Sequence, residues 1–451
     1  MKTQVDLIIH AKWVLPIVPT NKLYCDHAVV IHAGNIIKLL PSADVELCYI
    51  AAETIELGSH VLMPGFINLH THAAMSLMRG LADDLSLMDW LNHSIWPAER
   101  AFVSEKFVFD GSLLASAEML KGGITCFNDM YFYPEATVKA TLQAGIRANI
   151  GLTILEFPTN YANDAEDYLQ KGLNARDTWR DLALITTSFA PHAPYTVSDT
   201  TFEKIVTYAE QVNIGIHTHL HETQSEIAQS LQQYGMRPLQ RLKELGVLSP
   251  SFTAAHGVHL NEDEVALLAQ YGCHVAHCPS SNLKLASGFA PVSKLSNQSV
   301  NVGIGTDSAA SNNRLDMLSE MRTAALLAKA VSSNAGSINA FKALEMATIN
   351  GAKALGLEAK IGSIEIGKQA DLIAVKLDDI ECSPIYDPIS HLVYVAGREQ
   401  VSHTWVAGDL RYQKLEDGLG VYANIEPNEL KSIVAYWQPK LAEFKQKNQR
   451  R

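Results

Sequence analysis

The sequence has few cysteines and no long apolar run. Six cysteines are scattered over 451 residues without a Cys-x-x-Cys pair, which argues against a disulfide framework and a zinc ribbon. The first residues lack the apolar core of a signal peptide, and the apolar runs are too short to cross a bilayer. These absences predict a cytoplasmic protein in a reducing compartment, without a membrane partner.

Basic residues are in the minority. The chain has 36 Lys and Arg against 48 Asp and Glu, a net charge of −12, and no basic run precedes the short tail at residues 445–451. This balance argues against a nucleic acid partner. The tail itself is expected to be a solvated, frayed terminus.

Short strands and long amphipathic stretches alternate through the middle of the chain. The candidate strands lie at residues 61–72, 124–127, 148–154, 184–189, 214–218, 253–255, 274–276 and 302–305. Helices are expected between most of them, for example at residues 105–120, 199–211, 225–234 and 262–270. Eight βα units over about 300 residues predict a (β/α)8 barrel of the TIM type.

The two ends of the chain have a different pattern. Short strands separated by turn residues are expected at residues 5–10, 28–31 and 35–40, and again at residues 370–375, 391–395 and 403–406. We therefore predict an α/β protein with two parts. The barrel would span residues 61–360, and a small β-sandwich domain would combine residues 1–60 with residues 361–451, tail included.

Polar side chains gather at the carboxyl ends of five predicted barrel strands. They are His70 and His72, His192, the series His217, His219, His221 and Glu222, then His256, and finally Asp307. The first two lie two residues apart, so on a strand they share one face. A lone His-x-His is more often structural than functional. Matching groups at five remote strand ends, where barrel active sites lie, are hard to explain by packing.

At these positions the sequence resembles the amidohydrolase superfamily, in its cytosine-deaminase-like and triazine-hydrolase-like branch. The segments that carry the resemblance are residues 64–72, 217–222, 255–258, 277–282 and 303–307, with residues 362–364 and 367–372 near the C-terminus. Within this branch the chain is most similar to the 5-methylthioadenosine/S-adenosylhomocysteine deaminases. The resemblance covers nearly the whole chain.

The resemblance implies one divalent metal ion per subunit, usually zinc. Its ligands would be His70, His72, His219 and Asp307. Three imidazoles, one carboxylate and a water suit zinc, and they suit iron(II) nearly as well. His217 and His221 flank His219 and could compete with it, but the family pattern of a histidine three residues before a glutamate selects His219 with Glu222. Relatives with two metal ions carry a lysine at the end of strand four, and residues 188–192 contain none.

The resemblance also implies a hydrolytic deaminase of adenosine derivatives, 5-methylthioadenosine and/or S-adenosylhomocysteine, which releases the inosine form and ammonia. Hydroxide supplied by the metal would attack the ring carbon that bears the amino group. Asp307 would carry the proton, His256 would hydrogen-bond the hydroxide and the oxyanion, and Glu222 would protonate a ring nitrogen. Substrate contacts are implied for Glu99, which would accept from the ribose hydroxyls, for His192, and for Glu222 and Asp307.

Other functions remain open at this point. The same scaffold could act on guanine, a pterin or a chlorinated triazine, or could have lost catalysis, although Glu222 favours deamination because chloride displacement needs less proton delivery. Residues 81–99, with Trp90 and Trp96, are expected either to form an apolar wall for the thioether side or to pack in the core. An arginine contacts substrate after strand three in some relatives, and Arg147 is the nearest here, without an assigned role. A homo-oligomer is expected, as in many family members.

Overall fold

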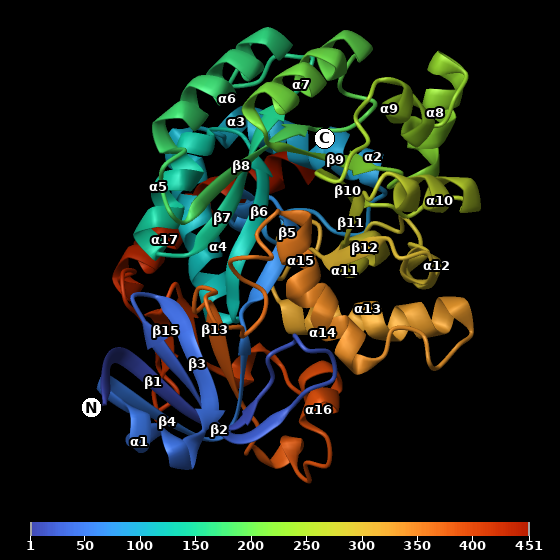
Figure 1. Cartoon of the computed structure of the whole chain (residues 1–451). Coiled ribbons are helices and arrows are strands. Elements are labelled where there is room, and N and C mark those ends of the chain that lie inside the picture. Colours follow the sequence, from blue (N-terminus) through green and yellow to red (C-terminus); the bar gives the residue numbers. More distant parts are fainter. Residues whose placement is uncertain (1, 450–451) are drawn as a thin grey trace.

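Eight parallel strands surrounded by helices form the larger part of the computed structural model, which describes residues 2–449 (Figure 1). The strands are β5 (Phe66–Thr71), β6 (Ile124–Tyr131), β7 (Arg147–Ile154), β8 (Ile185–Pro191), β9 (Gly215–Leu220), β10 (Phe252–His256), β11 (His274–His277) and β12 (Asn301–Ile304). They are hydrogen-bonded in sequence order, and every neighbouring pair is parallel. The predicted (β/α)8 barrel is confirmed.

Side chains join the first and last barrel strands. The Asn68 Nδ2 donates to Thr306 Oγ1 at 2.7 Å, and the Thr306 backbone N–H donates to Asn68 Oδ1 at 2.9 Å. One residue further, the Asp307 N–H donates to the carbonyl of His70 at 2.9 Å. These bonds bring the end of β5 beside the residues that follow β12, so histidines and carboxylate far apart in sequence become neighbours.

Helices surround the barrel and connect its strands. They are α1 (Val45–Cys48), α2 (Leu87–Trp90), α3 (Trp96–Phe102), α4 (Glu105–Lys121), α5 (Pro134–Ala144), α6 (Ala165–Trp179), α7 (Asp199–Val212), α8 (Gln224–Tyr234), α9 (Pro238–Glu244), α10 (Glu262–Gln270), α11 (Pro279–Lys284), α12 (Val292–Asn297), α13 (Met317–Ser332), α14 (Ala340–Ala347), α15 (Ile349–Ala354), α16 (Pro388–Tyr394) and α17 (Pro427–Gln449). The four helices predicted as examples correspond to α4, α7, α8 and α10. Polar caps explain where they begin: Ser104 caps α4, and Asn261 forms a capping box with Glu264 in α10. Within residues 2–449, no helix is long and apolar enough to cross a bilayer.

Both ends of the chain build a second sheet, as predicted. Its strands, in spatial order, are β16 (Gly420–Tyr422), β15 (Asp409–Lys414), β14 (Val401–Val406), β13 (Leu372–Lys376), β4 (Tyr49–Pro64), β1 (Thr3–Val14), β2 (Tyr24–His32) and β3 (Asn35–Pro41). The sheet is mixed, because β1 and β4 pair in parallel while the other pairs are antiparallel. The division of the chain at residues 60 and 360 stays a prediction.

Two predicted strands differ from the structure. Residues 61–72 do not form one strand: β4 ends at Pro64 in the second sheet, and β5 begins at Phe66 in the barrel. The apolar sequence is continuous there, so its pattern hides the change of partner. Residues 391–395 lie mostly in helix α16, where Pro388 occupies the first turn and Asp387 caps the Ile389 N–H at 2.9 Å. Local capping therefore outweighs the β-branched composition of that segment.

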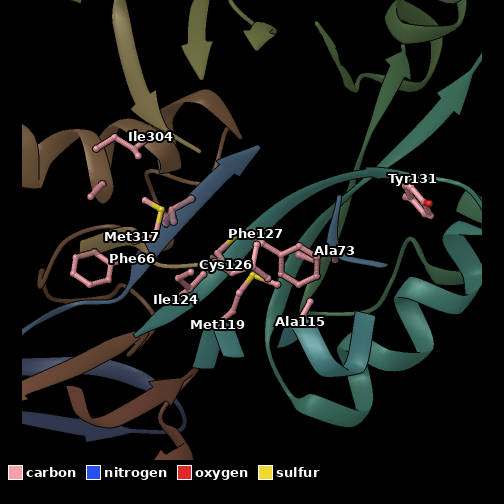
Figure 2. Close-up of a cluster of buried hydrophobic side chains, with 14 of the residues drawn as sticks. Phe66, Ala73, Ala115, Met119, Ile124, Cys126, Phe127, Tyr131, Ile304 and Met317 are labelled. Atoms are coloured by element: carbon pink, nitrogen blue, oxygen red, sulfur yellow. The ribbon is translucent and has the colours of Figure 1, made fainter. Parts of the chain in front are cut away.

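The barrel core is continuous with the packing of its helices. Figure 2 shows Phe127, Cys126 and Met119 among the side chains gathered between β6 and α4, and all three are fully buried. Burying an aromatic side chain of this size contributes on the order of 2–3 kcal/mol. This packing holds the strand ends, and hence the polar side chains on them, in place.

A buried ion pair joins the barrel to the second sheet. Arg147, at the start of β7, donates from Nε to Asp371 Oδ2 at 2.9 Å and from Nη2 to Asp371 Oδ1 at 3.1 Å. Neither side chain is more than 3% exposed. Because Arg147 opens its strand, it lies at the opposite end of the barrel from the histidines. It therefore does not serve as a substrate-contacting arginine.

Candidate metal centre

Three imidazoles and a carboxylate converge at the carboxyl ends of the barrel strands. His70 and His72 come from the end of β5, His219 from β9, and Asp307 from the turn after β12. The Nε2 atoms of His72 and His219 are 3.3 Å apart. Asp307 Oδ1 lies 3.2 Å from His72 Nε2 and 3.4 Å from His70 Nε2. The cluster is buried, with His70 fully so.

The donor atoms fit a zinc-type ion. A tetrahedral site with metal–nitrogen distances of 2.0–2.1 Å separates its ligand atoms by about 3.3 Å, close to the spacing between His72 and His219. His70 Nε2 is buried and has no hydrogen-bond partner among the described residues. His72 Nδ1 donates to the Met130 carbonyl at 2.5 Å, and His219 Nδ1 donates to the His192 carbonyl at 2.6 Å. Both Nε2 lone pairs are thus directed at the cluster.

Charge states also suit a cation. Burial lowers the pKa of His70 to about 4 and that of His219 well below its usual value, so both imidazoles are neutral at pH 7. Burial disfavours the charged form of His72 as well, but Asp307 raises its pKa to about 9. Despite burial, contacts with His70 and His72 hold the pKa of Asp307 well below its usual range. Metal binding would therefore release a proton from His72.

The two histidines that flank His219 do not join the cluster. His217 lies beneath it, where its Nε2 and His70 Nδ1 share a hydrogen bond of 3.0 Å. His221 points away, and its Nε2 accepts from the Leu239 N–H at 3.1 Å. On a strand, residues at i and i+2 share a face, but only His219 reaches the metal-facing position. His217 instead orients His70 from behind.

Glu222, His256 and Asp307 face one another beside the cluster. The Glu222 carboxylate lies with Oε2 3.7 Å from His256 Nε2, and burial raises its pKa. Asp307 Oδ2 accepts from Ser281 Oγ at 2.6 Å and from Ser311 Oγ at 2.7 Å. The backbone φ angles of His256 and Asp307 are 72° and 57°, a left-handed conformation that is uncommon outside glycine and often found at functional sites.

A cavity of about 370 Å³ opens over these groups. It falls within the size range of small-molecule sites. Every site residue predicted from the sequence lines it except His70, which is buried below: His72, Glu99, His192, His219, Glu222, His256 and Asp307. Trp90 and Trp96 line its outer part, together with other apolar side chains.

Glu99 lies on the wall of the cavity with one fixed partner. Tyr131 donates from its hydroxyl to Glu99 Oε1 at 2.9 Å. Burial raises the pKa of Glu99 to about 7. His192 lies nearby on the loop after β8, where its Nδ1 and the Thr196 hydroxyl share a hydrogen bond of 3.0 Å. The predicted contacts are thus brought to one cavity with the metal ligands.

Several residues of the site were missed by sequence reasoning. Tyr131, Ser311 and Glu226 carry no motif that singles them out, and each acts through the orientation of a neighbour. Glu226 accepts from the backbone N–H groups of His221 and Glu222, both at 2.9 Å. Ser281 lies within residues 277–282, which resemble the family, so a signal for it existed without a role.

The sequence profile of the amidohydrolase family matches residues 61–411. The chain belongs to the amidohydrolase family.

Curated relatives of this amidohydrolase cover its full length. It is 47% identical over 440 residues to a 5-methylthioadenosine/S-adenosylhomocysteine deaminase of Saccharophagus degradans, with 98% of each chain covered. It is 46% identical to the enzyme of the same name from Teredinibacter turnerae, with 97% of this chain and 98% of that chain covered.

Solved structures match the fold of this amidohydrolase. An adenosine deaminase from Xanthomonas campestris with bound zinc superposes with a TM-score of 0.95 at 45% identity, over 98% of this chain and 100% of that chain. Atrazine chlorohydrolase from Arthrobacter aurescens, complexed with zinc, superposes with a TM-score of 0.87 at 22% identity, over 96% of this chain and 100% of that chain. At that identity the second likeness concerns the fold alone.

Proposed function

We propose that this amidohydrolase deaminates 5-methylthioadenosine and/or S-adenosylhomocysteine to the inosine form, with release of ammonia. The observation that carries the proposal is a single cavity lined by metal-ligand candidates, by Glu222 beside them and by Glu99 further out. The names of relatives at 46–47% identity over nearly the whole chain support the same substrates. The zinc reported for the Xanthomonas campestris structure supports the metal.

One zinc ion per subunit would be held by His70, His72, His219 and Asp307, and iron(II) would suit the same donors. When bound, such an ion lowers the pKa of a water and makes hydroxide available near neutral pH. His70 and His219 are neutral and can bind without losing a proton. His72 must lose its proton, and its Nδ1–H bond to the Met130 carbonyl keeps Nε2 as the binding atom.

Asp307 and His256 handle the attacking water in this proposal. Asp307 is ionised at neutral pH, so its carboxylate accepts the proton of the water and later passes it to the leaving ammonia. His256 Nε2 faces the same space and hydrogen-bonds the attacking oxygen. Ser281 and Ser311 hold the far oxygen of Asp307, which keeps Oδ1 directed at the cluster.

Glu222 makes the ring carbon electrophilic. Burial raises the pKa of its carboxyl, which favours the protonated form that delivers a proton to the ring nitrogen beside the attacked carbon. Glu226 fixes the backbone of the Glu222 turn through two N–H bonds, so the carboxyl is held against the cavity. Proton delivery of this kind is what an amino leaving group requires.

The outer cavity recognises the rest of the nucleoside. Glu99 accepts hydrogen bonds from the ribose hydroxyls, with Tyr131 holding one of its oxygens, and His192 contacts the nucleoside from the opposite wall. Trp90 and Trp96 supply an apolar surface for the thioether substituent.

A spectrophotometric screen of the zinc-loaded protein tests the proposal. The substrates are 5-methylthioadenosine, S-adenosylhomocysteine, adenosine, guanine and an aminotriazine, and the readout is the absorbance change from adenine to hypoxanthine. Turnover of the thionucleosides is expected. Turnover of guanine or the triazine alone would keep the metal chemistry and discard the role of Glu99. Metal analysis of the same preparation should give one zinc per chain.

We also propose that the enzyme is cytoplasmic and acts as a homo-oligomer. Six free thiols in the described chain are consistent with a reducing compartment. Light scattering coupled to size-exclusion chromatography measures the assembly directly, and a mass of one chain would contradict the oligomer.

A further inference from the structure

Two consecutive residues of α11 contact two groups that the proposed chemistry requires. Ser281 reaches Asp307, and Asn282 reaches His256. Both lie in the segment of residues 277–282, which resembles the family and has no role in the proposed function. We propose that Ser281 and Asn282 are positioning residues that set the orientation of Asp307 and His256 together. This inference rests on the proposed function.

Asn282 determines which nitrogen of His256 faces the cavity as an acceptor. His256 Nδ1 donates to Asn282 Oδ1 at 2.8 Å, and both side chains are at most 1% exposed. A neutral imidazole with its proton on Nδ1 carries a lone pair on Nε2. That Nε2 lies 3.7 Å from Glu222 Oε2, on the side of the attacking water. Asn282 therefore presents His256 as an acceptor for the water proton.

Ser281 restricts the rotation of the Asp307 carboxylate. The two hydroxyls of Ser281 and Ser311 donate to the same oxygen, Oδ2, at 2.6 and 2.7 Å. The other oxygen, Oδ1, is left facing His70 and His72. Two donors on one oxygen hold the carboxylate plane in place, because any rotation breaks both bonds.

The helix that carries both residues is itself anchored to the loop after β12. Glu320, 1% exposed on α13, accepts from the Ser280 N–H at 3.1 Å and from Asn312 Nδ2 at 2.8 Å. Asn312 Nδ2 also donates to the Thr306 carbonyl at 2.8 Å. The start of α11 and the backbone next to Asp307 are thus tied to one buried carboxylate. A single rigid connection keeps the two catalytic side chains in register, as an oriented site requires.

The test compares Asn282→Leu and Asn282→Asp in the zinc-loaded protein. Leucine removes the acceptor, and we expect kcat to fall about 10- to 100-fold with KM unchanged, below the full effect of a general base. Aspartate keeps an acceptor in the same place, so kcat should return to within about fivefold of the wild type. A residue that only fills space would not be rescued by a charged isostere. Zinc content should stay at the wild-type value, since Asn282 touches no ligand.

Asn301→Leu is the matched control. Asn301 and His274 form another Asn–His pair in the same barrel, with a hydrogen bond of 2.9 Å, at the opposite ends of the neighbouring strands. Its kcat should equal that of the wild type. Ser281→Ala tests the second contact independently, and we expect a loss in kcat of about 2- to 12-fold, the factor for one hydrogen bond of two.

The outcomes separate the two levels of the argument. A wild-type kcat in Asn282→Leu, or equal damage in Asn282→Leu and Asn282→Asp, would overturn the positioning role of Asn282. If Asn282→Leu does not fold, Asn282→Asp and Ser281→Ala decide: a 10-fold or larger loss in the first, with no loss in the second, refutes the inference. A wild type that turns over no nucleoside would overturn the proposed function itself.

Discussion

Glu99 is the residue whose replacement discriminates best between a nucleoside site and a site for a free base. Its carboxylate has one oxygen held by Tyr131 at 2.9 Å, which leaves the other for the substrate. Glu99→Gln keeps the shape of the side chain and removes its charge. A hydrogen bond to a charged acceptor contributes about 1.5–3 kcal/mol. We therefore expect kcat/KM for 5-methylthioadenosine to fall about 10- to 150-fold at pH 8.

The pH dependence follows from the same carboxyl. Its pKa is raised by burial to about 7, and only the ionised form accepts from both ribose hydroxyls. In the wild type kcat/KM should rise between pH 6 and pH 8, since about one-tenth of Glu99 is ionised at pH 6. Glu99→Gln should lack this rise. For folding the sign is opposite: a raised pKa favours the folded state most below the ordinary value of 4.5, and that contribution is lost as pH rises through about 7. The variant should therefore gain thermal stability relative to the wild type at pH 8 but not at pH 4.

The decisive assay removes the hydroxyl instead of the carboxylate. Rates are measured for the wild type and Glu99→Gln with 5-methylthioadenosine and with its 2′-deoxy derivative, which makes a double-mutant cycle across the contact. Loss of the hydroxyl should cost the wild type far more than the variant. Equal costs in both proteins would refute the contact between Glu99 and the ribose. Glu105→Gln is the matched control, because Glu105 is exposed and pairs with Lys139 on the surface at 2.6 Å.

Four further results are expected. Glu222→Gln should lower kcat about 10²- to 10⁴-fold without loss of zinc, because only proton delivery is removed. His217→Leu should weaken zinc binding about 10- to 100-fold in a chelator competition, because His70 loses the hydrogen bond that orients it. Asp371→Leu should lower the free energy of unfolding by about 3–5 kcal/mol in a urea titration, because Arg147 is left buried and unpaired. Dialysis against a chelator should abolish turnover, and zinc should restore it.

Controls and contrary outcomes accompany these tests. His274→Gln removes a buried barrel histidine away from the cluster, so an equal loss of zinc affinity there would remove the case for His217. Asp409→Asn breaks a surface ion pair with Arg411 and should cost at most about 1 kcal/mol. Full activity of zinc-loaded Glu222→Gln would exclude the proton-delivery role. Activity that survives complete zinc removal would exclude the metal mechanism.

Spacing along the chain was enough to predict the barrel and the groups at its strand ends. Apolar strands alternating with amphipathic helices have few arrangements available, and in a parallel barrel the carboxyl ends of all strands meet at one face. His70, His72, His219 and Asp307 could therefore be placed together without coordinates. The same pattern failed at residues 61–64 and 391–395, where a continuous apolar run and β-branched side chains gave no sign of a change of sheet or of helix α16.

Contacts between residues remote in sequence required the tertiary structure. His217, His219 and His221 are equivalent as a pattern, and only the fold separates the metal-facing imidazole from one that orients His70 and one that bonds to Leu239. Likewise, nothing local indicates that Asn282 meets His256 or that Tyr131 meets Glu99. Periodicity reports which face of an element is apolar, whereas hydrogen-bond direction and side-chain reach depend on how the elements close around one another.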